Sequence, residues 1–394
     1  MLMIDNRDLY RLFDSYSTPA YVFDENEVAE RAGKIRDILK CGSLCYSIKA
    51  NPFLIPALLP VVNYFEVCSP GELSICESLS VPGEKIIYSG VHKETDDIIR
   101  ALKYNAAIIT AESVRQFNLI CEAANDTGTC PDVILRLSSK NQFGMSLEDI
   151  GYILSHPCEQ VKITGLHYFA GTGRKQNKKR IEELEMLSAA TDDLRERYGC
   201  SLPLLEYGPG LPYPYFSDED FSDTLSPLHE LMPYLEKISG KCDLSVEMGR
   251  FIASSCGYYI TGVCDIKRSS DNNWCIVDGG INHLNYLGQM MGMKTPVIRH
   301  YRNEDVIDDS NGITYSVCGS LCTANDVLVR SILLDDLQIK DKLVFMNAGA
   351  YSVTESMGLF LSRNLPRVIL YRDGIAKSVR DDMETWRINS RVDV

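Results

Sequence analysis

Short apolar runs alternate with helical patterns between about residue 20 and residue 265, and this alternation strongly limits the possible folds. The segment TPAYVFDENEVAERAGKIRDILK shows it first, because the run at 21–23 precedes a stretch whose Val28, Ala32, Ile35 and Leu39 share one helix face. Further strands are predicted at 44–48, 64–67, 85–88, 107–110, 133–137, 163–168, 204–207 and 244–246. Because repeated right-handed βα units close naturally at eight, we expect a parallel (β/α)8 barrel.

The pattern changes after about residue 265, where strand-like runs follow one another without long helices between them. These runs are WCIVDGG, GITYSVCG, KLVFMNAGAYS and RVILYRDG. They are typical of a separate, mainly antiparallel β domain. We therefore expect an α/β protein with a TIM-like barrel of residues 20–265 and a β domain made of residues 1–19 and 266–394, and 394 residues suffice for both.

Composition excludes several classes of function. The formal charge of −14 disfavours nucleic acid as a partner, because phosphate binding needs a basic face. No apolar run is long enough to span a bilayer, and the first residues lack the features of a signal peptide, so we expect a cytoplasmic protein. The 14 cysteines are scattered without a CxxC pair, which favours reduced thiols over disulfides, a zinc site or a dithiol redox centre.

Several reactive side chains follow predicted barrel strands. Five of them stand at strand ends, namely Lys49, Arg136, His167, Phe169 and Glu247. The C-terminal ends of barrel strands meet at one mouth of the barrel. Each has an ordinary explanation when taken singly, such as a surface lysine, a core histidine or an aromatic that fills the barrel. Their joint placement indicates one site.

Two glycine-containing stretches late in the barrel could bind a phosphate. They are EYGPG at 206–210 and EMGR at 247–250, where backbone N–H groups can approach an anion closely. A lysine beside a phosphate cradle, an acid and an aromatic ring is what pyridoxal phosphate (PLP) needs. The amine bonds to the cofactor, the cradle anchors its phosphate, and a carboxylate keeps its ring nitrogen protonated.

The chain resembles the fold type III PLP-dependent decarboxylases, which include diaminopimelate, ornithine and arginine decarboxylases. The resemblance covers nearly the whole chain. It implies an alanine racemase-like barrel and a decarboxylase-type β domain. The stretches that carry it are YSIKANP, FEVCSPGEL, ILRL, QFGMS, GLHYFAGT, YGPG, VEMGR, VDGG, CGSLCTANDVL and NAGAYS.

The resemblance implies a role for each matching residue. Lys49 matches the lysine that bonds to PLP, and Glu247 matches the acid that pairs with the pyridinium nitrogen. Arg136 resembles the arginine near the phenolic oxygen, and Phe169 stands where the family has a histidine that stacks on the ring. Cys322 resembles the cysteine that one subunit of an obligate homodimer supplies to its partner's site. The positions that match the phosphate cradle are Gly208, Gly210, Gly249, Arg250 and Tyr351.

The resemblance also implies α-decarboxylation of an amino acid. An acid beside the ring nitrogen makes the ring an effective electron acceptor, whereas racemases of this fold usually place an arginine there. Cys322 is the candidate proton donor to the carbon that loses its carboxylate. Without the resemblance, Cys322 reads equally well as a small buried apolar residue.

Three departures from the family bear on the substrate. Thr323, in CTAND, replaces the acid that holds a distal amine in diamino acid decarboxylases, and a buried ammonium without a partner is costly. The stretch VDGGINHLNYLGQMMG lacks the arginine with which diaminopimelate decarboxylases bind a distal carboxylate, and Phe169 replaces the histidine. We expect a substrate without a distal ammonium.

A natural-product branch of the family offers such a substrate. The stretches FAGT, INH and LFLSRNLPRV resemble the butirosin-type enzyme, which decarboxylates a glutamyl group on an acyl carrier protein. An acidic carrier protein would need a basic patch, for which the run at 174–180 is a candidate, although such a run is often only a solvated helix start.

Other activities stay open from the sequence. A diaminopimelate or other diamino acid decarboxylase could use displaced contacts, for example from Glu355, and a racemase or a non-catalytic partner-binding homologue is also possible. His167 could support the cofactor or bond to a carbonyl. Asn282 and His283 could line the substrate site or lie in a turn.

Overall fold

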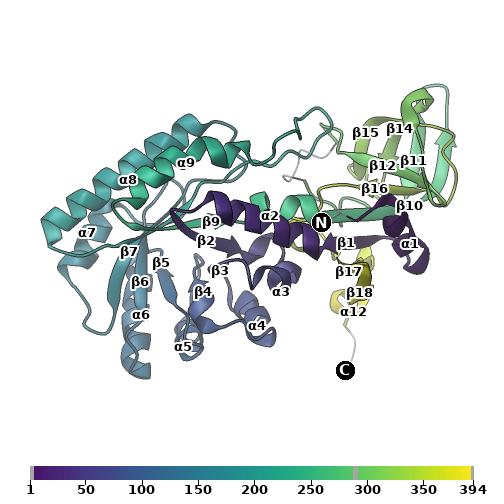
Figure 1. Ribbon diagram of the computed structural model, residues 1–394. Coiled ribbons are helices and arrows are strands. Elements are labelled where there is room, and N and C mark those ends of the chain that lie inside the picture. Colours follow the sequence, from purple (N-terminus) through teal and green to yellow (C-terminus); the bar gives the residue numbers. More distant parts are fainter. Residues whose placement is uncertain (1–3, 287–291, 392–394) are drawn as a thin grey trace. The chain divides into compact units, whose positions relative to one another are not determined.

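The structure is a computed structural model that describes residues 4–286 and 292–391 (Figure 1). The chain divides into two compact units, which are described separately. The barrel unit consists of residues 31–213 and 223–252, and the sheet unit consists of residues 1–30, 214–222 and 253–394. Part of the stretch VDGGINHLNYLGQMMG, residues 287–291, lies outside the described residues.

The barrel unit contains a closed ring of parallel strands, as the sequence predicts. The pairing of β2 with β9 closes the ring, with Cys45 opposite Glu247. The strands are almost entirely buried, which suits a parallel barrel covered on its outside. They are β2 (Gly42–Ser47), β3 (Tyr64–Val67), β4 (Ile86–Tyr88), β5 (Ile108–Ala111), β6 (Asp132–Arg136), β7 (Lys162–Phe169), β8 (Leu204–Gly208) and β9 (Asp243–Met248).

Helices follow most barrel strands, and the barrel interior is packed. Cys45, Ile87 and Ile134, from the alternate strands β2, β4 and β6, share one apolar cluster with Ile108, and Leu204 of β8 packs against it. Such layers are expected inside an eight-stranded barrel. The helices are α2 (Glu25–Ile38), α3 (Ile55–Leu58), α4 (Pro70–Ser78), α5 (Thr95–Lys103), α6 (Val114–Thr127), α7 (Leu147–Ser155), α8 (Asn177–Tyr198), α9 (Ser226–Ser239) and α10 (Arg250–Ala253).

The sheet unit is built on a large, mainly antiparallel sheet with the order β13-β12-β16-β10-β1-β17-β18. The strand pairs β1–β17 and β11–β14 are parallel. Its core includes Val22, Tyr258, Ile260, Val344 and Ile369. The elements are α1 (Asn6–Ser15), β1 (Ala20–Asp24), β10 (Gly257–Arg268), β11 (Asn273–Val277), β12 (Ile298–Arg302), β13 (Asp305–Val306), β14 (Ile313–Cys318), β15 (Val327–Leu334), β16 (Lys342–Phe345), α11 (Ser352–Glu355), β17 (Arg367–Arg372), β18 (Ile375–Arg380) and α12 (Trp386–Asn389).

The strand predicted at 21–23 does not lie in the barrel, although the predicted range of 20–265 included it. As β1 it pairs antiparallel with β10 and parallel with β17. All five residues of β1 are buried. A short apolar run fits a barrel strand and a central sheet strand equally well, so the sequence pattern alone could not assign its partners.

No helix within residues 4–286 and 292–391 combines the length and apolar character needed to cross a membrane.

A buried histidine makes the sheet unit sensitive to pH. His300 lies 2.9 Å from Asp309 and 2.9 Å from Asp341. Burial alone would lower the pKa of His300, but its bonds to both carboxylates raise that pKa from 6.5 to about 9. A histidine whose pKa is higher in the folded state than in the unfolded state stabilises the folded state at pH values below its unfolded-state pKa. This contribution disappears as the pH rises through the folded-state pKa.

We therefore expect the free energy of unfolding to fall by on the order of 1–3 kcal/mol between pH 6.5 and 9 because of His300. Urea denaturation across this pH range would measure it. The variant His300→Gln should be less stable than the wild type near pH 6.5 and should show a flatter pH dependence. His229→Gln, at an exposed position on α9, serves as the control. Parallel pH profiles for wild type and His300→Gln would contradict the assignment.

Candidate active site

Lys49 lies immediately after β2, in a short 3-10 turn that spans Ile48–Ala50. The strand ends at Ser47, and Pro52, which has no N–H to donate to a sheet, begins a second short turn after Asn51. The hydroxyl of Tyr46 donates to the carbonyl of Asn51 at 3.0 Å and fixes the turn. Lys49 thus stands at the C-terminal end of a barrel strand, where barrels carry their reactive groups.

Two buried carboxylates meet the Lys49 amine. Its Nζ contacts Glu66 Oε2 and lies 3.4 Å from Glu247 Oε1 and 3.6 Å from Cys68 Sγ. The Lys49 side chain is 36% exposed, whereas the side chains of Glu66 and Glu247 are 4% and 5% exposed. The amine therefore links two buried anions to the accessible part of the site.

Glu247 is held in place by two further groups. Ser47 Oγ donates to Glu247 Oε1 at 2.8 Å, and His167 Nε2 lies 3.3 Å from Oε2. Burial alone would raise the pKa of Glu247, but the Lys49 ammonium and the hydrogen bond from His167 lower it well below its usual range. Glu247 is therefore an ionised carboxylate with a fixed orientation.

The pKa of a third acid in the barrel interior is shifted in the opposite direction from that of Glu247. Glu206, in β8, is fully buried. Burial, followed by the negative charges of Glu247 and Glu66, raises the pKa of Glu206 well above its usual range. Burial thus favours the protonated form of Glu206, whereas the partners of Glu247, in the neighbouring strand β9, favour its ionised form.

The end of β6 carries a second buried ion pair. Arg136 Nη1 donates to Glu112 Oε1 at 2.6 Å, and both side chains are nearly buried. The Arg136 guanidinium also lies 4.9 Å from the centre of the Phe143 ring. Both contacts restrict Arg136 to one position at the barrel mouth.

Lys49, Glu247 and Arg136 line one cavity of about 250 Å³. The structure brings together Lys49, Arg136, Phe169 and Glu247 from the predicted site residues, with His167, which the sequence placed at a strand end without a role. Residues that the sequence reasoning missed also line it, namely Glu66, Cys68, Gly90, Val91, Glu112 and Phe143. Glu66 lies one residue before the end of the strand predicted at 64–67, and Glu112 lies two residues after the strand predicted at 107–110. This closeness to a strand end is the signal that could have identified them.

Two glycines of the YGPG stretch occupy positions that no other residue would fit. A Cβ atom added to Gly208 would lie 2.4 Å from the Phe169 ring and 3.4 Å from Glu247 Oε2. Gly210 has a φ of +57°, and an added Cβ would lie 1.8 Å from the Gly171 carbonyl oxygen. Both positions are therefore packed closely against the chain itself, and only glycine fits there.

The other predicted cradle residues of the barrel unit follow β9. Gly249 directly precedes α10, and its carbonyl accepts from the N–H of Ile252 at 3.1 Å. Arg250 is the first residue of α10, is buried, and its Nε lies 3.5 Å from Thr172 Oγ1. Gly249 and Arg250 thus follow the strand that carries Glu247.

The remaining predicted residues lie in the sheet unit. Tyr351 precedes α11 and has a φ of +67°, which is rare for a residue with a side chain. Cys322 is exposed in the segment between β14 and β15. The buried Asp326 holds this segment by accepting from the N–H groups of Leu321 at 2.7 Å and Ile281 at 2.9 Å. The segment is therefore fixed while its cysteine faces outward.

Both ring nitrogens of His283 lie close to polar groups of the sheet unit. His283 is buried, its Nε2 lies 3.0 Å from Asn282 Nδ2 and 3.1 Å from the Asn364 carbonyl oxygen, and Tyr259 Oη is 3.2 Å from Nδ1. Burial lowers the pKa of His283 to about 4, so the ring is neutral at physiological pH. Glu355 is exposed at the end of α11, and Asn285 Nδ2 donates to it at 3.4 Å.

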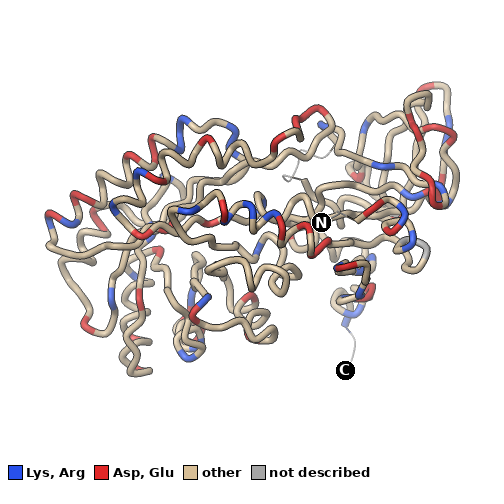
Figure 2. The backbone as a smooth tube through the Cα atoms, in the orientation of Figure 1, with Lys and Arg blue, Asp and Glu red and all other residues tan. Residues whose placement is uncertain are grey.

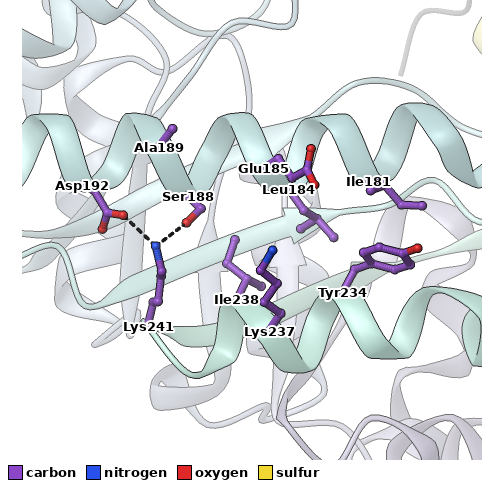
Figure 3. A pocket seen from close by; sticks show the side chains of 10 residues that line it. All are labelled: Ile181, Leu184, Glu185, Ser188, Ala189, Asp192, Tyr234, Lys237, Ile238 and Lys241. Carbon is purple, nitrogen blue, oxygen red and sulfur yellow. Dashed lines mark hydrogen bonds and ion pairs between the residues drawn. The ribbon is translucent and has the colours of Figure 1, made fainter.

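A second hollow lies on the outside of the barrel unit, between α8 and α9 (Figure 3). It has a volume of about 330 Å³ and is larger than the cavity at the strand ends. Its lining combines aliphatic side chains with an ion pair, in which Lys241 Nζ donates to Asp192 Oδ2 at 2.7 Å. None of the predicted site residues lines it, so its size does not make it the active site.

Comparisons with known proteins show which protein family this chain is similar to. The family described as "Pyridoxal-dependent decarboxylase, C-terminal sheet domain" matches residues 20–349. A diaminopimelate decarboxylase of Methanocaldococcus jannaschii is 25% identical over 402 residues, covering 93% of this chain and 89% of that protein. The L-glutamyl-(BtrI acyl-carrier protein) decarboxylase of Niallia circulans is 25% identical over 404 residues, covering 96% and 94%.

The fold is also similar to solved structures. The crystal structure of diaminopimelate decarboxylase from M. jannaschii in complex with L-lysine has a TM-score of 0.82 at 22% identity, and the match covers 95% of this chain and 92% of that one. This similarity confirms the predicted fold class, a (β/α)8 barrel with a mainly antiparallel sheet domain.

Proposed function

The chain belongs to the family of pyridoxal-dependent decarboxylases, and from this premise we propose that Lys49 and Glu247 serve the α-decarboxylation of a substrate that lacks a distal ammonium. The contact that carries the proposal is between the Lys49 amine and the ionised Glu247 carboxylate, whose atoms are 3.4 Å apart at the barrel mouth. An amine and a fixed anion in one cavity are the two groups that PLP chemistry needs first.

The residues present fit PLP. Lys49 offers an amine for the cofactor's aldehyde carbon, and Glu247 offers an ionised carboxylate for its ring nitrogen. Backbone N–H groups around Gly208 and Gly210 would hold the phosphate, together with Gly249 and Arg250, and Arg136 would lie near the phenolic oxygen. When bound, PLP supplies a ring that accepts the electrons left behind by the departing carboxylate.

The chain's own residues control the protons around Lys49. An amine must lose its proton before it can bond to a carbonyl carbon, and Glu66 Oε2, in contact with Lys49 Nζ, is positioned to accept that proton. Burial and the charge of Glu66 raise the pKa of the Cys68 thiol well above its usual range, so Cys68 stays protonated and does not compete as a nucleophile.

Ser47 and His167 orient the Glu247 carboxylate, one at each oxygen. A fixed anion in a buried site stabilises positive charge without reorganisation, which is the usual source of a large electrostatic contribution to catalysis. Phe169 lines the same cavity, and its ring can cover the face of a planar cofactor as the family's histidine does.

The substrate assignment is supported by Thr323, which follows Cys322 in the fixed segment before β15. A threonine hydroxyl does not neutralise an ammonium, so a substrate with a distal amine would lose a charged partner here. The relative from Niallia circulans acts on a glutamyl group that is held on a carrier protein. We therefore favour an amino acid, or an aminoacyl group on an acyl carrier protein, with glutamate as the first side chain to test.

Release of CO2 from a substrate panel tests this choice. The panel contains glutamate, glutamyl acyl carrier protein, lysine, ornithine, arginine and meso-diaminopimelate. Turnover of the glutamyl substrates alone would support the proposal. Preferential turnover of meso-diaminopimelate would establish the second candidate, which is favoured by the M. jannaschii relative. Hydrogen exchange at the α-carbon without CO2 release would indicate a racemase, and failure to bind PLP would indicate a non-catalytic homologue.

We also propose a homodimer in which Cys322 of each subunit completes the active site of the other. Its exposure in a single chain is consistent with this role. Mixing the inactive variants Lys49→Ala and Cys322→Ala should restore up to about a quarter of the wild-type activity, since random exchange makes half of the dimers mixed, each with one intact site. Activity assays after mixing and subunit exchange measure this, with each variant alone as the control. Failure to regain activity in dimers shown to have exchanged would contradict the shared site.

A further inference from the structure

Two arginines of the basic run at 174–180 do not form a solvent-facing patch. Arg180 is fully buried, and the Arg174 side chain is only 18% exposed. The interpretations of this run as a carrier-protein patch or as a solvated helix start are therefore wrong for these two cations. Along the rest of α8, acidic residues interrupt the basic ones (Figure 2). The buried arginines need another explanation.

Both guanidinium groups donate to one backbone carbonyl. Arg174 Nη2 donates to the Pro209 oxygen at 2.9 Å, and Arg180 Nε donates to the same oxygen at 2.8 Å. The Arg174 N–H donates to the Gly210 carbonyl at 3.1 Å. Arg180 also donates to the Arg174 carbonyl and to Asn177 Oδ1. The loop after β7 is thus tied to the turn that follows β8.

A carboxylate and a tyrosine keep Arg174 in place. Glu183 accepts from both terminal nitrogens of Arg174, with 3.0 Å between Nη2 and Oε2. Tyr207, which directly precedes the turn, donates its hydroxyl to Glu183 Oε2 at 3.0 Å. Glu183 and Arg180 are three residues apart on α8 and share one helix face. Two cations and one anion therefore leave a net positive charge behind the turn.

The position of the Pro209 carbonyl determines the direction in which the Gly210 N–H points. In a trans peptide the C=O and N–H bonds point in opposite directions, so a Pro209 carbonyl fixed toward the arginines directs the N–H of Gly210 to the other side of the turn. Charged donors on a carbonyl also polarise the peptide and strengthen its N–H as a donor. Gly210 has the positive φ that this turn requires, and no Cβ fits at this position.

We propose that Arg174 and Arg180 are positioning residues for the cofactor's phosphate, because they hold the Pro209 carbonyl and thereby orient and polarise the Gly210 N–H. This inference rests on the proposed function only in taking the turn at 208–210 as the phosphate site. The two arginines act through the backbone, so they need not touch the phosphate themselves.

Binding of PLP and of pyridoxal, which lacks the phosphate, separates this role from general stabilisation. The dissociation constant of each compound for cofactor-free protein is measured by absorbance titration. We expect Arg174→Gln to weaken PLP about tenfold and pyridoxal less than about twofold, because only the phosphate loses its oriented donor. Arg180→Lys keeps the charge but not the shape of the donor group, and we expect a smaller loss that is also specific to PLP.

Arg195 provides a matched control on the same helix. Its Nη2 donates to the Leu202 carbonyl at 2.6 Å, so it makes the same kind of contact away from the turn. Arg195→Gln should keep the wild-type ratio of the two dissociation constants. If Arg180→Lys does not fold, Arg174→Gln decides, since Arg174 is partly exposed.

The outcomes distinguish this inference from the proposed function. A wild-type protein that binds PLP no better than pyridoxal would contradict the phosphate site itself, and the role of the arginines with it. A wild-type preference for PLP that persists in the Arg174 variant would overturn the positioning role alone. Equal weakening of both compounds would also overturn it, because it would show a general structural effect.

Discussion

Replacing Lys49 with alanine is expected to lower kcat by at least ~10³-fold and to remove the visible absorbance of covalently bound cofactor. The methyl group of alanine cannot bond to the cofactor, and it leaves Glu66 and Glu247 buried without the ammonium that contacts both. Two neighbouring buried carboxylates without a cation repel each other. CO2 release and the absorbance spectrum of the purified variant measure the two effects.

Lys85 is the control for this prediction. It stands just before β4, and its Nζ donates to the carbonyls of Leu59 at 3.0 Å and Val62 at 2.8 Å. This position is at the N-terminal end of a barrel strand, where residues serve stability and not catalysis. Lys85→Ala should lower the free energy of unfolding and leave the spectrum unchanged. A Lys49→Ala enzyme that retained both the spectrum and turnover would contradict the role of Lys49.

The sequence predicts the barrel because its strands are buried on both sides and its helices have one apolar face. All eight predicted strands from 44–48 to 244–246 occur within two residues of their predicted bounds. The run at 21–23 satisfies the same pattern but pairs in the sheet unit as β1. The apolar pattern shows that a strand is buried but not which strands it pairs with, because its pairing partners lie far along the chain.

The candidate site could also be predicted only in part. Lys49 and Glu247 could be predicted because they are charged residues at the C-terminal ends of buried strands, where barrels carry their catalytic groups. The partners that set their charges were not predicted, since Glu66 and His167 reach them from other strands. Their contacts depend on the register between β2, β3, β7 and β9, which the sequence pattern does not contain.

The buried arginines give a further example. A basic run at the start of a helix usually faces water, and the sequence of 174–180 contains no sign that two of its cations are inside. What buries them is a carbonyl at Pro209, about thirty residues later, and a carboxylate at Glu183. These contacts form because β7 and β8 pair in the barrel, and the local sequence around 174–180 does not show that pairing.

The second large effect is expected for Glu247→Gln, which should lower kcat roughly 10²- to 10³-fold. Glutamine has nearly the same shape and can keep bonds to Ser47 and His167, but it carries no charge to stabilise a protonated ring nitrogen. CO2 release measures the loss, and the pH dependence of the cofactor's absorbance should show that the ring nitrogen loses its proton at lower pH.

Glu206→Gln is the matched control, because Glu206 is a buried glutamate in the adjacent strand β8. Burial and the nearby Glu247 and Glu66 charges raise the pKa of Glu206, which favours the neutral form of the wild-type side chain. Replacing a neutral acid with a neutral amide should change kcat less than about threefold, since no charge is removed from the site.

Equal losses in both variants would show that the barrel tolerates no change at either position, and would contradict a specific electrostatic role for Glu247. A large loss for Glu247→Gln alone would show that the ionised state of this one carboxylate, and not the presence of acids in the barrel, is what the reaction requires.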